Sequence, residues 1–285
     1  MNILKKNFSL IVFLLFLGSF SFSLELNLKI SGALSYFNLN HINLALQGRE
    51  QSVKKLADLY QDWIYKEGEI KNFHLGTCFE GEFLIFFSPH IATGLSVGYL
   101  YGEASEEKTS ISITRNSDTY IFMNPITINS FPFNLTAYYF FPLQSKLKLF
   151  VKGGAGLLWT KFVERKEIKK MPANQFTYLS LQKATALGKS FFSGIGIVYE
   201  AEENIHFFIE GQLRLAKISN FRGEIKGEEK GTLYFYEEYN SDLDFWESKN
   251  QLLKEEPSGD TVRSVQKTVI DLSGVSIILG FSFKF

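Results

Sequence analysis

The chain has 285 residues, with 30 basic and 30 acidic side chains and therefore no formal net charge. This balance gives no electrostatic reason to bind nucleic acid, and the length allows one large domain or two small ones. Phe is abundant at 29 residues whereas Pro is scarce at 6, which favours an all-β protein over a disordered one. The single cysteine, Cys78, can form neither an internal disulfide nor a zinc cluster alone, so we expect a buried, inert thiol.

The first residues have the layout of a secretory signal peptide. Lys5 and Lys6 precede an apolar run of about ten residues, and Ser21 and Ser23 are small residues placed for cleavage before Leu24. The apolar run is too short to span a bilayer comfortably as a helix. We therefore expect residues 1–23 to be a signal peptide and residues 24–285 to be one exported domain.

The mature chain is dominated by alternation of apolar and polar residues with a period of two, which is typical of strands with two different faces. The last segment shows the pattern clearly, with Leu279, Phe281, Phe283 and Phe285 on one face. Eight segments alternate in this way, and they cover residues 24–37, 74–87, 91–103, 130–141, 147–159, 190–200, 205–217 and 268–285. The connections between them alternate between short and long. This is the layout of an all-β, eight-stranded antiparallel up-and-down barrel in an outer membrane, with short periplasmic turns and long external loops.

Alternation alone does not say which face points outward, because a soluble lipocalin-like barrel alternates with its apolar residues inside. The apolar faces are long enough for tilted membrane strands, and the opposite faces are rich in the small residues that a narrow lumen needs. Aromatic residues also gather near the strand ends, as in membrane-interface girdles: Phe87, Tyr139, Phe141 and Tyr199 at one end, and Tyr36, Tyr101 and Trp159 at the other. These features favour a membrane barrel with apolar residues facing lipid.

With its signal peptide, its terminal strand ending in Phe285 and the stretch "AYYFFPLQSKLKLFVKGGAG" at 137–156, the chain resembles the small outer-membrane β-barrel proteins of Gram-negative bacteria. That group includes the OmpA membrane domain, OmpX and OmpW. The resemblance implies a monomer in outer-membrane lipid, without cofactors, assembled with periplasmic chaperones and the barrel-assembly machinery. It also implies that Phe281, Phe283 and Phe285 form the signal that this machinery reads.

Charged residues on the predicted inward face lie at comparable depths. Isolated charges in a narrow lumen are costly, so they are expected to pair. The sequence therefore predicts a Lys–Glu–Arg network at the barrel centre, made of Lys29, Glu80, Glu82, Lys152, Glu210 and Arg214. Glu80 and Glu82 also have the spacing of a catalytic carboxylate pair, but the cations nearby favour structural pairing.

Below this network, toward the periplasmic mouth, the inward residues are apolar. We expect them to form a stopper, made of Leu84, Phe86, Phe140, Phe150 and Phe208. A network above a stopper predicts a closed or very narrow lumen, in a protein with a structural or surface-contact role. The alternative is a gated, narrow channel for passive transport of small or hydrophobic solutes, as in the OmpW branch.

The long connections carry their own patterns. In the first, Val53, Leu56, Leu59, Tyr60, Trp63 and Ile64 recur at helical spacing, which predicts an amphipathic helix. A cap on the barrel rim is the favoured interpretation, and a lid or a helix lying in the membrane surface is the alternative. In another long connection, Arg115–Asp118 is expected to form the turn of a hairpin that continues past the membrane.

The connection from about 221 to 261 is acidic and aromatic. Tyr234, Tyr236, Tyr239 and Trp246 could serve contact with a ligand or a host, whereas a solvated surface loop is the simpler expectation. Its carboxylates show no EF-hand spacing.

The histidines show no catalytic arrangement. The chain has four histidines, His41, His74, His90 and His206, and none lies in an HExxH or H-x-S arrangement. His41 and His74 flank the first long connection, so a site at the rim is conceivable there. We expect a protein that is not an enzyme.

Overall fold

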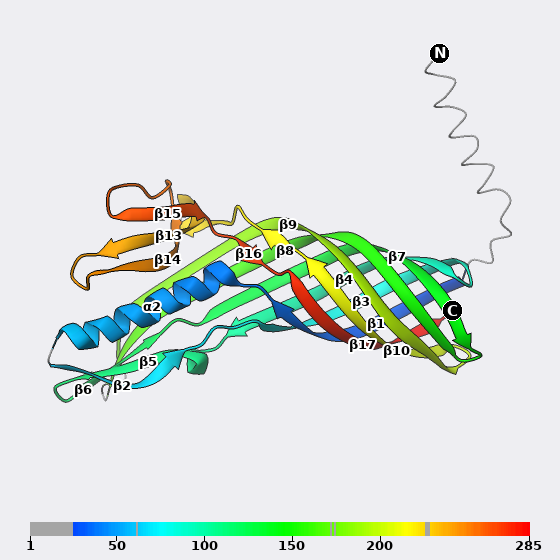
Figure 1. Ribbon diagram of the computed structural model, residues 1–285, viewed down its shortest axis with the longest axis horizontal. Coiled ribbons are helices and arrows are strands. Elements are labelled where there is room, and N and C mark those ends of the chain that lie inside the picture. Colours follow the sequence, from blue (N-terminus) through cyan, green and yellow to red (C-terminus); the bar gives the residue numbers. More distant parts are fainter. Residues whose placement is uncertain (1–24, 61, 172, 174, 226–228) are drawn as a thin grey trace, which may run out of the picture.

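A computed structural model describes residues 25–60, 62–171, 173, 175–225 and 229–285. The expected signal peptide, residues 1–23, lies outside these residues. The described chain is an antiparallel all-β structure with a long α-helix and one short 3-10 helix (Figure 1). None of its helices has both the length and the hydropathy needed to cross a bilayer.

A closed ring of antiparallel strands forms the body of the molecule. Each strand of the ring pairs with the next, and the last pairs with the first. In order around the ring the strands are β1 (Glu25–Phe37), β3 (Leu75–Ser88), β4 (Ile91–Ala104), β7 (Ile126–Gln144), β8 (Leu147–Met171), β9 (Gln175–Glu202), β10 (Ile205–Leu215) and β17 (Gly274–Lys284).

Tight connections join ring strands at one end of the molecule, on the right of Figure 1. They link β3 to β4, β7 to β8, and β9 to β10, as the alternation of short and long connections predicts. The opposite end continues into a second region, which we call the extension. It comprises α2 (Asn40–Leu59), the 3-10 helix η1 (Glu106–Lys108), the upper parts of β8 and β9, and the strands β2 (Trp63–Ile70), β5 (Thr109–Arg115), β6 (Asp118–Met123), β11 (Lys217–Ile218), β12 (Arg222–Ile225), β13 (Glu229–Asn240), β14 (Phe245–Leu253), β15 (Val262–Lys267) and β16 (Ile270–Asp271).

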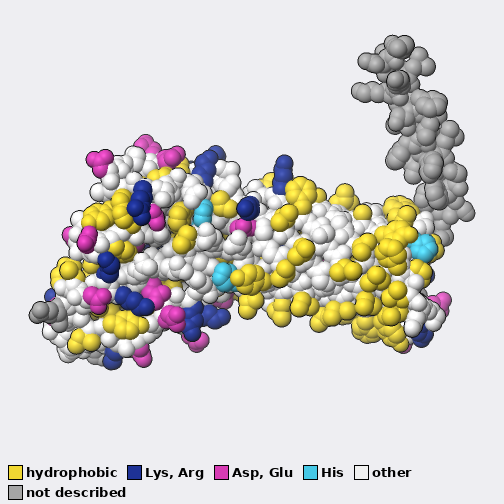
Figure 2. Space-filling model, viewed as in Figure 1, with side chains coloured by type: hydrophobic (Ala, Val, Ile, Leu, Met, Phe, Trp, Pro, Cys, Tyr) yellow, Lys and Arg dark blue, Asp and Glu magenta, His cyan; other side chains and the backbone are white. Residues whose placement is uncertain are grey.

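The outer surface of the ring carries an apolar belt. Leu34, Phe79, Leu135 and Ile277 are each more than half exposed, although they lie in the middle of paired strands. Figure 2 shows hydrophobic side chains gathered over the end with the tight turns and charged side chains gathered over the extension. The ring therefore exposes apolar side chains where a soluble domain would bury them.

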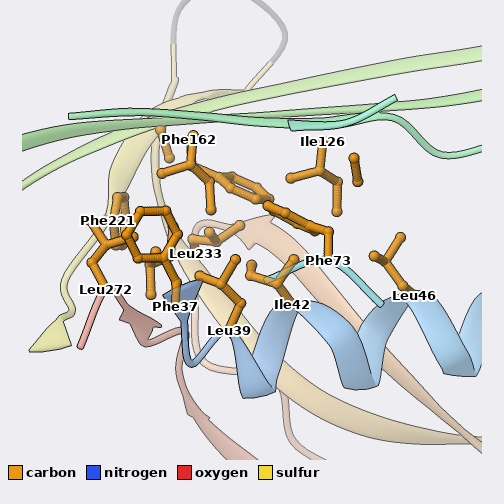
Figure 3. Close-up of a cluster of buried hydrophobic side chains, with 14 of the residues drawn as sticks. Phe37, Leu39, Ile42, Leu46, Phe73, Ile126, Phe162, Phe221, Leu233 and Leu272 are labelled. Atoms are coloured by element: carbon orange, nitrogen blue, oxygen red, sulfur yellow. The ribbon is translucent and has the colours of Figure 1, made fainter. Parts of the chain in front are cut away.

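The extension buries apolar side chains in its interior. Helix α2 contributes Leu46 and Val53 to a core that also contains Ile111, Phe162 and Leu233 from the surrounding strands (Figure 3). At Gly48 the helix lies so close to Ser248 of β14 that a Cβ atom would clash with the backbone of that strand. The helix is thus an internal element of the extension, packed mainly against β14, β2, β5 and β16, and a cap on the barrel rim stays a prediction.

The helix boundaries differ from the sequence prediction. The helix begins at Asn40, well before Val53, and ends at Leu59, whereas Trp63 and Ile64 belong to strand β2. The early turns were missed because their buried face includes small and polar residues such as Asn43, Ala45, Gly48 and Ser52.

The region from 221 to 261 was expected to be a solvated loop, and this was wrong. It forms strands β12 to β14, and Tyr234 and Tyr236 are only 8% and 5% exposed. These residues alternate only in part, because both faces of the segment contact protein. The predicted turn at Arg115–Asp118 is confirmed, but it joins β5 to β6, a separate hairpin whose second strand pairs with β8.

Candidate functional site

The interior of the ring is the part of the molecule on which the sequence places candidate functional residues. Four of the six predicted charges meet there. Lys29 of β1 lies 3.2 Å from Glu210 of β10 and 3.6 Å from Glu82 of β3, and Lys152 of β8 lies 2.7 Å from Glu210. Their side chains are at most 6% exposed, so two cations and two carboxylates neutralise each other away from water.

Tyr138 of β7 completes this cluster. Its hydroxyl donates to Glu82 at 2.6 Å and accepts from Lys29 at 3.1 Å. The Lys29 ammonium also lies 4.2 Å from the centre of the Phe208 ring. The alternation along residues 130–141 places Tyr138 on the inward face, but no role was assigned to it from the sequence. Its position could have indicated this role, because it places a hydroxyl group at the same depth in the ring as the charged residues.

Glycines on neighbouring strands make room for the two carboxylates. A Cβ atom at Gly94 would clash with the Glu82 carboxylate, and one at Gly194 would lie 2.9 Å from Oε1 of Glu210. The glycines of the inward face therefore hold space for the charged layer, which is why small and charged residues occur together on that face.

The remaining two predicted charges lie outside these ion pairs. Glu80 accepts a hydrogen bond from Asn134 at 3.0 Å, and Asn134 also contacts Ser96. Within the described residues, Arg214 forms no ion pair and its Nη1 has no hydrogen-bond partner. The compact cluster is thus Lys29–Glu82–Lys152–Glu210 with Tyr138, and Glu80 and Arg214 lie beside it.

Layers of different chemistry lie on either side of the charges. Toward the extension, hydroxyl pairs cross between neighbouring strands: Ser35 lies 2.7 Å from Ser276, and Ser130 lies 2.7 Å from Thr160. Toward the tight turns, an apolar cluster contains all five residues of the predicted stopper, with Phe86 only partly buried. The ring interior is therefore filled by side chains at each of these levels.

A cavity of about 140 Å³ opens among the aromatic residues at the end with the tight turns. Phe140, Phe150 and Phe208 line it, and its innermost polar lining is Lys29 and Tyr138. Glu82, Lys152 and Glu210 do not line it. The cavity thus stops at the charged layer.

The outer wall carries an apolar groove of about 790 Å³, lined among others by Phe83, Leu95, Phe133 and Phe191. Behind the groove, strands β3, β4, β7, β8 and β9 remain paired with their neighbours. Gly81 lies opposite Val97 at one side of the groove, and Leu157 lies opposite Lys189 at the other. The groove is therefore a hollow in the surface and not a lateral opening into the lumen.

The terminal aromatic residues lie at the end with the tight turns. Phe281 is 38% exposed and Phe285 is 78% exposed on the outer face, and Phe281 and Phe283 contact each other edge to face. The backbone N–H of Phe285 donates to Leu26 at 3.0 Å, and Lys284 pairs with Glu25 at 2.6 Å. Strand β17 therefore closes the ring against β1 as far as the last residue.

The histidines take part in local structure. His74 lies 2.9 Å from the Phe37 carbonyl and stacks on Tyr36, and His41 accepts from the Val269 N–H at 3.0 Å. Cys78 is buried and free. Among the described residues, no three His, Cys, Asp or Glu side chains are grouped to hold a metal ion.

Comparison with known proteins gives no family assignment. No protein-family model and no curated protein matches the chain. Among solved structures, Neisserial surface protein A has a TM-score of 0.38 at 10% identity, covering 91% of this chain and 97% of that one. Ail of Yersinia pestis, solved with the heparin analogue sucrose octasulfate, has a TM-score of 0.34 at 11% identity, covering 92% and 99%. The outer membrane protease OmpT of Escherichia coli has a TM-score of 0.32 at 9% identity, covering 93% and 98%. These likenesses are too weak to support any activity, and membership of the OmpA, OmpX and OmpW group stays a prediction.

Proposed function

We propose that this protein is a monomeric, integral outer-membrane barrel with a closed lumen, which displays a rigid external domain for contact with the exterior. The eight paired ring strands span the membrane, and the extension lies outside the cell. No catalytic step is part of this proposal.

The membrane location is supported by the reversal of residue chemistry along single strands. On β7 the outward residues change from Leu135 and Phe133 to Asn129 and Thr127, while the inward residues change from Thr136 to the fully buried Ile128. Such a reversal is expected where a strand leaves lipid and enters water, because the apolar side chains must then turn inward to be buried.

The closed lumen depends on one observation above all, the buried cluster of Lys29, Glu82, Lys152 and Glu210. Those side chains bridge β1, β3, β8 and β10 across the ring. A water path through this layer would require at least one of these ion pairs to separate, and the separated charges would then have no other buried partner. The aromatic layer below and the core of the extension above add two further barriers.

Single-channel recording in planar bilayers tests the closed lumen. The purified wild type is expected to give no stable openings, and a Glu210→Ala variant is the matched comparison because it removes the carboxylate that both lysines share. Large, lasting openings of the wild type would instead support the channel alternative.

Labelling of intact cells tests the orientation. Cys78 is buried, so an introduced cysteine becomes the accessible thiol. A membrane-impermeant maleimide is expected to label Ser117→Cys in the β5–β6 turn and to leave Glu203→Cys in the β9–β10 turn unlabelled until the cells are opened. The reverse pattern would contradict the proposal.

The role of Phe281, Phe283 and Phe285 in assembly is a second part of the proposal. Their place on the strand that closes the ring supports it, because the last strand must be paired before the barrel is complete. A Phe285→Ser variant is expected to reach the outer membrane in smaller amounts, while the same variant refolds normally in detergent.

A further inference from the structure

A polar cleft lies in the extension, away from the lumen. It is bounded by α2, the β8–β9 hairpin and β14, and its volume is about 420 Å³. The cleft exists because β12 pairs with β9 only at two positions, Arg222 with Thr185 and Gly223 with Ala184. Beyond that point, β9 separates from the sheet that contains β13 and β14. The volume falls within the range of roughly 300–1,000 Å³ that is usual for small-molecule sites.

Arg49 of α2 lines this cleft, and no polar side chain of the described residues pairs with it. Among the described residues it forms no ion pair, and its buried Nε makes no hydrogen bond. Its guanidinium group lies 5.4 Å from the centre of the Phe122 ring. Burial lowers the pKa of Arg49, with Glu247 acting in the opposite direction, but a guanidinium group keeps its charge at neutral pH. The Nε donor of this partly buried cation is thus left without an acceptor.

The two other cations of the cleft are already neutralised. Lys249 lies 2.7 Å from Glu238 and 3.0 Å from Glu247, and Lys166 lies 3.7 Å from Glu164. Arg49 is therefore the cation of this cleft that remains available to an incoming anion.

A second buried polar group in the cleft also lacks a partner. Asn124 is 1% exposed, and its amide nitrogen donates to Glu164 at 3.2 Å, while its side-chain carbonyl oxygen accepts no hydrogen bond from any residue that the structure describes. Buried polar atoms without partners are rare in folded proteins and are costly when they stay unpaired. The cleft thus combines an unpaired donor with an unpaired acceptor.

The remaining lining suits a hydroxyl-rich ligand. Glu224, Glu247 and Gln251 offer acceptors for hydroxyl groups, and Tyr178 offers a half-exposed ring at the rim. Gln182 is held in place, because it donates to Glu164 at 3.0 Å and accepts from the Leu252 N–H at 2.6 Å. The carboxylates would repel a doubly charged phosphate or sulfate group more strongly than a singly charged carboxylate.

We propose that this cleft binds a small carboxylate-bearing polyol, such as an acidic monosaccharide. The ligand carboxylate would lie against Arg49, one hydroxyl group would donate to Asn124, and the apolar face of the ring would stack on Tyr178. This inference extends the proposed contact role and rests on it only in placing the cleft on the exterior.

Binding to the purified, folded protein in detergent micelles tests the site, and it does not depend on lumen conductance or on orientation. The probes are glucuronate, glucose and glucose 6-phosphate, followed by calorimetry and by saturation-transfer NMR. Saturable binding of glucuronate, in preference to both other sugars, is expected at millimolar concentrations or below. Absence of glucuronate binding, or tighter binding of glucose 6-phosphate, would overturn the proposal.

Variants locate the binding to the cleft. Arg49→Gln is expected to weaken glucuronate binding by roughly 10- to 100-fold, since a hydrogen-bonded charge is lost. Arg49→Lys should fall in between, because it keeps the charge and loses the fork. Arg115→Gln, which removes an exposed guanidinium group in the β5–β6 hairpin, is the matched control and should bind as the wild type does.

Tyr178→Ala provides an independent variant at the rim, where folding is not at risk. It is expected to weaken binding severalfold through lost stacking. Wild-type affinity in both folded Arg49→Gln and Tyr178→Ala would show that the sugar binds elsewhere.

Discussion

The ring and the extension share strand β8 and bury the same face of it, but the residue chemistry of its two faces is reversed between them. In the ring part, Leu157 and Trp159 point outward and are about half exposed at 46% and 53%, while Lys152 is buried inside at 6%. In the extension part, Lys161 points outward and Phe162 is fully buried inside. A single uninterrupted strand therefore exchanges its apolar and polar faces within a few residues of Trp159.

The inward face of β8 is therefore buried in both regions, and what differs between them is the kind of side chain that each face carries. In the proposed membrane location, lipid would accept the apolar side chains on the outer face of the ring, so that polar groups fill the lumen and satisfy each other there. Water would surround the extension, so the same strands place their apolar residues inward and gain the usual stabilisation from their burial. Helix α2 contributes buried residues such as Leu46 and Val53 to the core of the extension.

The largest expected effect comes from the charged layer of the ring. Glu210→Gln leaves Lys29 and Lys152 without the carboxylate that both share, and breaking a buried ion pair costs about 3–5 kcal/mol. The measurement is the free energy of unfolding in urea, with the protein folded into lipid vesicles. Glu202→Gln, at an exposed turn, is the control and should change little. A loss below about 1 kcal/mol for Glu210→Gln, the size expected for an exposed pair, would mean that the lumen is wet.

The apolar core of the extension should respond almost as strongly. Phe162→Ala removes a fully buried ring, and such truncations cost about 3–5 kcal/mol. Phe191→Ala removes a ring that is 59% exposed on the outer face, and it should cost less than about 1 kcal/mol. Thermal unfolding of both variants, followed by near-ultraviolet circular dichroism, measures the difference. Equal losses would contradict the distinction between the two regions.

An arginine scan along β7 locates the boundary between them. Leu135→Arg places a charge in the apolar belt and should destabilise the barrel by about 2–4 kcal/mol, whereas Thr127→Arg, beyond the reversal, should cost about 0–1 kcal/mol. Reversible folding into vesicles gives both values. If the two substitutions cost the same, the membrane boundary does not lie between these residues.

The smallest effect is a dependence on pH that belongs to the extension alone. Burial lowers the pKa of His41, so the folded state favours the neutral ring, which accepts from Val269 and stacks on Phe235. Stability from this residue is complete above the ordinary histidine pKa near 6.5 and is lost as the pH falls from there toward the lowered value. His41 is half-buried, so solvent screens the effect.

His41→Gln should remove that part of the acid sensitivity, as measured by hydrogen exchange in the β13–β16 segment between pH 7.5 and pH 5. Exchange in β1 and β3 serves as the internal reference. An unchanged acid response in His41→Gln would assign the sensitivity to other groups.

Much of the ring was predictable because a barrel imposes a simple rule on every strand. Each residue faces either outward or the lumen, so the period of two in segments such as 274–285 identifies the strands and their faces. The inward positions of Lys29, Glu82, Lys152 and Glu210 follow from the same alternation, and a narrow ring leaves them little choice except to meet. Arg214 was expected to join them, yet alternation gives depth and face only, and it does not give the direction of a long side chain.

What the sequence by itself determined is therefore the ring: its strands, its outward apolar face and the chemistry of its lumen. Only the tertiary structure decided the extension, including the start of α2 at Asn40, the folding of residues 221–261 into strands, and the cleft beside Arg49. The reason is that burial in the extension depends on which segments, far apart in the chain, cover each other. Alternation within one segment carries no information about such a neighbour.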